Sequence, residues 1–252
     1  MQGMTAMCCG SRAKARAKIE FAMFLPIHDN TVLKLIRFQF VTGIILIINV
    51  VLFIYTHVLV GDAGEVSIAT SLGAIPALFT DQATLDPSLQ VVPEPATLLT
   101  YMFLHASWLH LIANMAFLWV FADNVEDSFG HGGFLLFYLI CGVVAALAHI
   151  YTAPASQAPL VGASGAVSGV MASYLVLFPR ARVWVLLFMK LPILISALWA
   201  LVGWFAFQVI SLLATQEGNV IVAWWAHIGG FLAGLIITLG MLKLFRARFA
   251  GE

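Results

Sequence analysis

Apolar residues in this chain come in long runs that are separated by shorter polar segments. A transmembrane helix needs about 20 mostly apolar residues to cross a hydrocarbon core about 30 Å thick. No run alternates polar and apolar residues with a period of two, so a transmembrane β-barrel is not expected. The pattern therefore predicts an all-α fold, a polytopic membrane protein with a bundle of six transmembrane helices. The six predicted spans are 40–60, a segment within 98–122, 133–153, 160–178, 193–214 and 220–242.

The apolar stretch 183–214 is too long for one untilted span, and Lys190 and Pro192 divide it. A helix rises 1.5 Å per residue, so the whole stretch would exceed the thickness of the hydrocarbon core. We therefore expect 183–191 to lie at the membrane interface and the fifth helix to start at residue 193.

Composition agrees with a bilayer environment. Hydrophobic residues make up 62% of the chain, charged residues only 10%, and the mean hydropathy is +1.00. Soluble domains have about 45–50% apolar and about 25% charged residues. These values exclude a soluble enzyme, a disordered chain and a nucleic-acid-binding protein. The three cysteines are too few for a disulfide framework.

The basic residues are segregated along the chain. Of the 12 Lys and Arg residues, six precede the first span, three lie between the fourth and fifth spans, and three follow the sixth. The positive-inside rule then places both termini in the cytoplasm. We expect a basic N-terminal tail over 1–38, a six-helix domain over 39–245 with an external loop at 61–97, and a C-terminal tail over 246–252.

Four polar side chains of the predicted spans fall at one depth. His110 and Asn114 are four residues apart on one face of the second helix. Ser164 is the fifth residue of the fourth span and His227 the eighth residue of the sixth, so their depths differ by roughly 5 Å. Polar residues inside a membrane are costly and are candidates for function. We expect these four to converge near the external face.

Small residues allow the fourth and sixth helices to approach closely. Gly165 and Gly169 are four apart on the fourth helix, and Gly230 and Gly234 are four apart on the sixth. His227 shares the face of the latter pair. Helix packing alone also explains such glycines.

Serine and histidine together favour acyl-transfer chemistry. Serine is a weak nucleophile that needs an adjacent base, and histidine is the usual one. No Asp or Glu occurs in any predicted span, so a hydrolase of this kind would use a Ser164–His227 dyad. Oxyanion donors would come from Asn114, His110 and the Ser164 backbone N–H, which Gly162 leaves unobstructed. The sequence has no HExxH motif, and we expect no metal and no cofactor.

These residues stand in motifs that resemble the rhomboid family of intramembrane serine proteases. The motifs are HASWLHLIAN at 105–114, GASG at 162–165 and AHIGGFLAG at 226–234. The resemblance covers about 38–245. It implies Ser164 as nucleophile, His227 as general base, and His110, Asn114 and Gly162 in the oxyanion hole. It also implies membrane-protein substrates cut near the external face, and a structural role for His105.

The chain departs from the family pattern at one position next to the site. Some members have an aromatic residue four positions after the nucleophile, which packs on the catalytic imidazole. Ser168 stands there in this chain, so other neighbours must hold His227, and Trp224 and Trp225 are candidates.

The sequence is also compatible with two other classes of function. A rhomboid-like pseudoprotease would bind membrane segments without cutting them, and a transporter would use the polar residues as a path through the membrane. The sequence shows no internal repeat of the kind that transporters have. By analogy with compact six-span members, we expect a bacterial inner membrane as the location.

Overall fold

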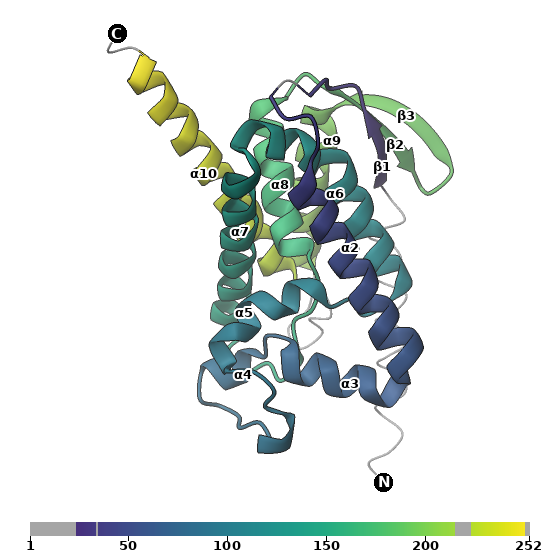
Figure 1. The fold of residues 1–252 in the computed structure, drawn as a ribbon, viewed down its shortest axis with the longest axis vertical. Helices are drawn as coiled ribbons and strands as arrows, with labels where there is room; N and C mark the ends of the chain where they lie inside the picture. Colours follow the sequence, from purple (N-terminus) through teal and green to yellow (C-terminus); the bar gives the residue numbers. More distant parts are fainter. Residues whose placement is uncertain (1–23, 34, 215–222, 250–252) are drawn as a thin grey trace.

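The computed structural model describes residues 24–33, 35–214 and 223–249. Its main body is a bundle of helices that run roughly parallel to one long axis (Figure 1). The large helices are α2 (Phe40–Ile54), α6 (Trp108–Phe129), α7 (His131–Thr152), α8 (Ser164–Leu177), α9 (Ala197–Ala214) and α10 (Trp224–Phe249). A π-helical segment, η1 (Tyr55–Val60), extends α2 to its end.

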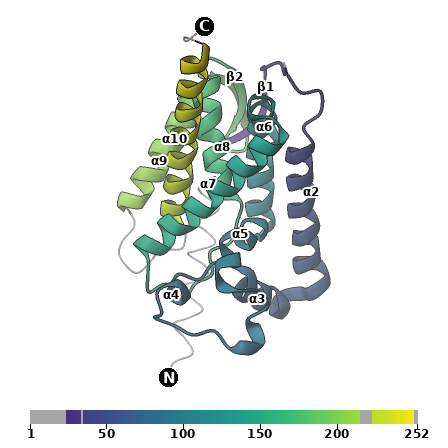
Figure 2. The ribbon, with the colours of Figure 1, turned by 60° about the vertical axis from the view of Figure 1, so that its left-hand side comes forward.

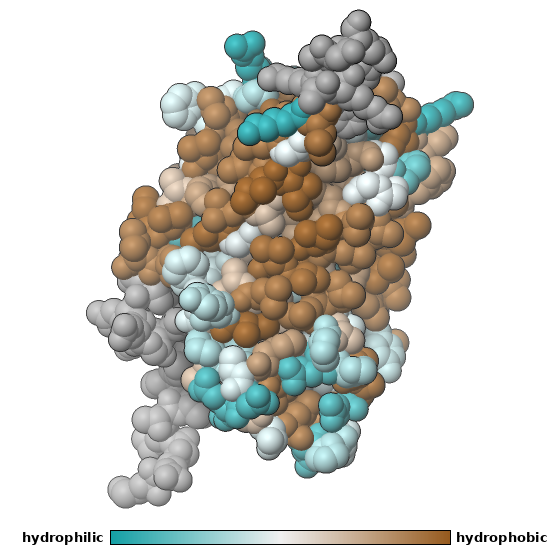
Figure 3. Space-filling view, turned by 90° about the vertical axis from the view of Figure 1, so that its left-hand side faces the viewer, coloured by the Kyte–Doolittle hydropathy of each residue, from teal (hydrophilic) through white to brown (hydrophobic). Residues whose placement is uncertain are grey.

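Among the described residues, four helical segments are long and apolar enough to cross a membrane, and two apolar helices are shorter. The long segments are Phe40–Val60, Trp108–Phe129, His131–Thr152 and Trp224–Leu244, and the shorter ones are Ser164–Leu177 and Ala197–Leu213. All six overlap the predicted spans, but the second helix starts at Trp108 and continues to Phe129, past the predicted limit of residue 122 and through Asp123, Glu126 and Asp127. Figure 3 shows a broad apolar band over the side of α7 and α10, with polar residues gathered at one end. The molecule is thus mainly helical and has the surface of a membrane protein.

Helix α8 occupies the centre of the bundle. It contacts α6, α7, α9 and α10, which surround it in both ribbon views (Figures 1 and 2). Every residue from Gly165 to Tyr174 is buried. Small residues of this helix let its neighbours come close, so most of this short helix is covered by protein.

The long loop between α2 and α6 folds into short helices at one end of the bundle (Figure 1). Its core residues, such as Ala74 and Ile75, are buried. Ala74 exchanges two backbone hydrogen bonds with Leu160, N to O at 3.2 and 2.8 Å. The loop thereby supports the segment that leads into α8. Its elements are α3 (Gly61–Leu72), α4 (Pro76–Phe79), η2 (Pro87–Leu89), η3 (Glu94–Ala96), α5 (Thr97–Thr100) and η4 (Tyr101–Phe103).

A three-stranded antiparallel sheet at the other end of the bundle contradicts the all-α expectation. The order is β1 (Phe24–Asp29), β2 (Arg182–Leu187), β3 (Leu191–Ser196). The expected interfacial piece 183–191 is mostly strand and turn, and α9 starts at Ala197 instead of residue 193. β-branched and large aliphatic side chains favour extended backbone, and Pro192 is accommodated because β3 is an edge strand.

Strand β1 belongs to the segment that the sequence assigned to the N-terminal tail, 1–38. It pairs with β2 from Phe24 opposite Leu187 to Asp29 opposite Val183. Residues 24–29 are therefore part of the folded body. Residues 1–23 of that tail, the inter-helix residues 215–222 and residues 250–252 of the predicted C-terminal tail lie outside the described residues.

Buried acids at the end of α6 hold the start of α2. Glu126 is fully buried and accepts hydrogen bonds from the backbone N–H groups of Val41 (3.1 Å) and Thr42 (2.8 Å) and from the Thr42 hydroxyl (2.6 Å). The first N–H groups of a helix lack intrahelical partners and favour negative charge. The Glu126 carboxylate thus fixes α2 against α6.

Candidate active site

Ser164 is the first residue of α8, and the segment before it makes a sharp turn. Its backbone N–H is among the first four of the helix, which have no intrahelical acceptor. Gly162, two residues earlier, has φ +125°, a conformation that side-chain-bearing residues rarely adopt. Its N–H donates to the Tyr101 carbonyl oxygen at 2.9 Å. The loop helices and the turn together place Ser164 at the mouth of the bundle.

His227 lies in the first turn of α10 and faces Ser164. The distance from His227 Nε2 to Ser164 Oγ is 2.8 Å, and the histidine is 7% exposed. The spacing fits a hydrogen bond between a nucleophile and its base. The sequence placed these two side chains at one depth, and the structure brings them into contact.

Four glycines make this contact possible. A Cβ atom added to Gly230 would overlap the backbone of Gly165, and one added to Gly234 would overlap the backbone of Gly169. The two pairs therefore face each other across the α8–α10 interface. Their close backbone approach fixes the distance between the helices that carry Ser164 and His227.

Gln208 on α9 touches the other side of the imidazole and was not singled out in the sequence. Its Oε1 is 2.8 Å from His227 Nδ1, and the residue is 3% exposed. The imidazole is thus held at both nitrogen atoms, by Ser164 and by Gln208. The signal that could have found Gln208 is the same one used for His110: a polar side chain in an apolar helix.

His110 and Asn114 lie on α6 beside the nucleophile. A Cβ on Gly162 would lie 2.6 Å from His110 Cε1 and 3.7 Å from Ser164 Oγ, so the His110 ring packs directly on the turn. Asn114 lines the same cavity as Ser164, and its Nδ2 donates to the His110 carbonyl oxygen at 2.9 Å. The side chains proposed as oxyanion donors therefore border the space next to Ser164 Oγ.

His105, expected to be structural, is 4% exposed and stacks edge-on against His110, with 5.0 Å between ring centroids. Neither ring nitrogen has a hydrogen-bond partner among the described residues. The contact supports the position of His110 by packing.

Neighbours other than Ser168 hold His227. The Ser168 hydroxyl donates to the Ser164 carbonyl oxygen at 2.6 Å, within α8. Ring centroids of Trp204 and Trp224 lie 6.0 and 6.4 Å from the His227 ring. Of the two expected neighbours, Trp224 contacts the imidazole, whereas Trp225 is 40% exposed.

The cavity at Ser164 is small and closed in this structure. Its volume is about 20 Å³, enough for roughly one water molecule. Phe24 at the start of β1 and Trp204 on α9 form part of its wall. A group larger than a water molecule can enter this space only if a lining side chain moves. Besides Ser164 and the two aromatic residues, the lining comprises Asn114, Phe117, Val167, Met171, Gln208 and His227.

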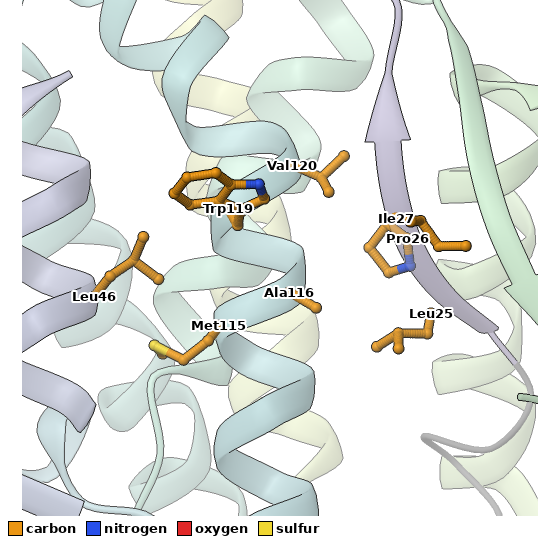
Figure 4. Close-up of a pocket in the computed structure, with 8 residues that line it drawn as sticks. All are labelled: Leu25, Pro26, Ile27, Leu46, Met115, Ala116, Trp119 and Val120. Carbon is orange, nitrogen blue, oxygen red and sulfur yellow. The ribbon is translucent and has the colours of Figure 1, made fainter. Parts of the chain in front are cut away.

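A larger hollow of about 390 Å³ lies on the other side of α6, between α2 and β1. Figure 4 shows side chains from the three elements around it. None of the eight is titratable, so the hollow offers no acid–base chemistry. Its lining residues are Leu25, Pro26, Ile27, Leu46, Met115, Ala116, Trp119 and Val120.

Comparison with known proteins places these features in a family. The model of the rhomboid domain matches residues 93–244, which include Ser164, His227, Gln208 and the two α6 side chains. The chain belongs to the rhomboid family. The predicted resemblance is therefore confirmed at the level of family membership.

Several curated rhomboid proteins are similar to this chain. The bovine presenilin-associated rhomboid-like protein, mitochondrial, is 29% identical over 173 residues, 66% of this chain and 43% of that protein. RHOMBOID-like protein 12, mitochondrial, of Arabidopsis thaliana is 27% identical over 61% of this chain and 47% of its own length. Rhomboid-like protein 11, chloroplastic, of the same plant is 45% identical over 73 residues, 29% of this chain and 26% of its own length. The match covers less than half the length of each of these relatives.

These rhomboid relatives correct one expectation. The predicted location in a bacterial inner membrane is contradicted, because the relatives carry mitochondrial and chloroplastic names. The analogy with compact six-span members did not carry information about location.

Proposed function

We propose that this rhomboid-family chain is an intramembrane serine endopeptidase that cuts membrane-protein segments by a Ser164–His227 mechanism. The single observation that carries the proposal is the 2.8 Å contact between His227 Nε2 and Ser164 Oγ at the start of a buried helix. A serine beside a histidine at a helix N-terminus combines a nucleophile, a base and backbone N–H donors.

The proposed reaction proceeds through an acyl-enzyme. His227 Nε2 takes the proton of Ser164 while Oγ attacks the carbonyl carbon of the scissile peptide bond. The tetrahedral oxyanion is held by the Ser164 backbone N–H and by His110 and Asn114. His227 then gives its proton to the leaving amine, and a water molecule releases the acyl group by the reverse sequence of steps.

The depth of the site defines the class of substrate. Ser164 begins α8 at the end of that helix that faces the short loop helices, since the Gly162 N–H just before it donates to the Tyr101 carbonyl oxygen of η4 at 2.9 Å. A peptide bond inside a helix is not available for attack, because its carbonyl is hydrogen-bonded and covered. The substrate is therefore a transmembrane segment that unwinds near the membrane surface, where small or helix-breaking residues make unwinding easier.

We also propose that all six apolar helices cross the bilayer. Helix α8 has only 14 residues, about 21 Å of rise. It is surrounded by other helices and meets little lipid. A helix in this position does not have to match the hydrocarbon thickness, because its middle, Gly165–Tyr174, is buried by the surrounding helices.

The experiment is a cleavage assay in detergent or vesicles with a panel of single-span membrane proteins. Ser164→Ala should abolish cleavage, a loss of at least about 10³-fold, because the nucleophile is gone. Ser173→Ala is the matched control, since the Ser173 hydroxyl is buried on the same helix and has no hydrogen-bond partner among the described residues. It should cleave at the wild-type rate.

Labelling by a fluorophosphonate probe separates the protease from its rivals. The folded wild type and Ser173→Ala should be labelled at Ser164, and Ser164→Ala should not. A folded wild-type protein that neither reacts with the probe nor cleaves any substrate would overturn the proposal and favour a pseudoprotease that binds membrane segments.

A further inference from the structure

The His227 imidazole contacts two groups of opposite hydrogen-bonding capacity. Ser164 carries an O–H that can donate to Nε2, and the atom of Gln208 nearest Nδ1 is the amide oxygen Oε1, at 2.8 Å. An amide oxygen only accepts hydrogen bonds. The contact therefore requires a proton on Nδ1, and in neutral imidazole the lone pair then lies on Nε2.

This arrangement decides whether His227 can act as a base. With the proton on Nδ1, Nε2 accepts the Ser164 hydroxyl proton. With the amide rotated, its NH₂ group would donate to Nδ1, the proton would lie on Nε2, and the histidine could not accept from Ser164. We propose that Gln208 is a positioning residue that holds His227 in the Nδ1–H tautomer, so that the site works as a Ser164–His227 dyad whose base is oriented by the Gln208 amide. This inference rests on the proposed protease function.

The surroundings explain why a neutral amide serves here. The nine residues that line the cavity include no Asp or Glu. A buried carboxylate would have to lose its hydration inside a membrane protein, which is costly without a full set of partners. An amide oxygen supplies the acceptor at a much smaller desolvation cost.

The helix α9 presents Gln208 to the site together with Trp204. The two residues are one helical turn apart and line the same cavity. Trp204 packs on the ring with 6.0 Å between centroids. One face of α9 therefore supplies both the hydrogen bond and part of the packing that orient His227.

During the proposed reaction no proton passes to Gln208. The Ser164 proton moves to Nε2, which creates an imidazolium whose Nδ1–H keeps donating to the amide oxygen. The contact of Gln208 is with Nδ1, the ring nitrogen of His227 that does not face Ser164 Oγ. Its contribution is the orientation and tautomer of the base, the role of the carboxylate in a Ser–His–Asp triad.

The first test measures the tautomer directly. Full-length protein labelled with ¹⁵N-histidine gives ring nitrogen shifts that distinguish Nδ1–H from Nε2–H, and a His227→Ala sample identifies the His227 signals. We expect Nδ1–H in the wild type and in Gln208→Glu. In Gln208→Met, which keeps the side-chain length but removes the amide, we expect a mixture or the Nε2–H form. An Nε2–H form in the wild type would overturn the inference, whether or not the protein cleaves.

The second test measures cleavage. Gln208→Met should lower kcat by roughly 10²–10³-fold with KM changed less than about threefold, because the proposed role of Gln208 is to orient the base and not to bind substrate. Gln208→Glu, which keeps an acceptor oxygen, should recover at least about a tenth of the wild-type kcat. Gly203→Ala is the control on the same helix, since an added Cβ meets no atom within 4 Å.

The two proposals fail in different ways. If the wild type cleaves and Gln208→Met retains kcat within about twofold, only the role of Gln208 is wrong. If neither protein cleaves and Ser164 takes up no probe, the protease function is wrong, and the nitrogen shifts still decide the orientation of the Gln208 amide.

Discussion

At the residue scale, Gly162 is subject to two independent constraints. Its φ of +125° disfavours any side chain, and a Cβ would meet His110 at 2.6 Å from Cε1 and 2.7 Å from Nε2. We expect Gly162→Ala to cost about 1–3 kcal/mol of stability through backbone strain. The methyl group would also push the His110 ring from the oxyanion position, so kcat should fall by roughly 10²-fold. Thermal unfolding in detergent and the cleavage assay check the two effects.

The control for this change is Gly132→Ala on α7, where an added Cβ meets no atom within 4 Å. Alanine favours a helix over glycine by about 0.5–1 kcal/mol, so this variant should be slightly more stable and fully active. Wild-type activity in Gly162→Ala would show that His110 has no role next to the nucleophile.

How far single residues could be predicted depended on their contrast with the surrounding sequence. Ser164, His227, His110 and Asn114 stood out because polar groups are rare in apolar runs. Gln208 also is a polar residue in an apolar run, about 9 Å from the outer end of the predicted fifth span, but its amide is neither a nucleophile nor a base, so residue chemistry alone did not mark it. Phe24 could not have been found, because nothing local links an aromatic residue near the N-terminus to a cavity formed by α6, α8, α9 and α10.

At the element scale, the contact of α8 with α10 sets the geometry of the site. The Gly234 position faces the backbone of Gly169 so closely that a Cβ there would overlap it. Gly234→Ala should push α10 outward and move His227 away from Ser164. A misplacement of about 1 Å is enough to lower kcat roughly 10²-fold. We expect reduced cleavage and a lower Tm.

Gly240→Ala is the matched control, because it lies on the same helix and an added Cβ meets no atom within 4 Å. It should leave both cleavage and Tm near the wild-type values. If Gly234→Ala and Gly240→Ala behave alike, close packing of α10 on α8 does not control the site.

The hydropathy pattern predicted the helices of this fold but missed its strands. Apolar runs of about 20 residues predicted the helices well, because no other regular structure satisfies backbone hydrogen bonds within one segment in lipid. The hairpin of β2 and β3 was missed because hydropathy does not distinguish an apolar strand from part of an apolar helix. Its pairing with β1 joins residues 154 to 163 positions apart, and such long-range pairing leaves no periodic signal in either segment.

At the scale of the whole molecule, two layers enclose the ends of the apolar helical bundle. The short helices α3 to α5 cover one end, and the three-stranded sheet covers the other (Figure 1). Ser164 lies toward the former end. The two layers should therefore lie on opposite sides of the membrane, and cleavage should take place on the side of the loop helices.

Single cysteines test this arrangement. In a Cys8→Ser and Cys9→Ser background, the remaining Cys141 is buried and should not react with a maleimide in the folded protein. Gln90→Cys adds an exposed thiol to the loop layer, and Arg180→Cys adds one beside the sheet. A membrane-impermeant maleimide applied to sealed vesicles of uniform orientation should label only one of the two, and detergent should expose the other. Labelling of both before detergent would contradict the placement of the layers, because an impermeant reagent cannot cross an apolar bundle and its lipid to reach both ends.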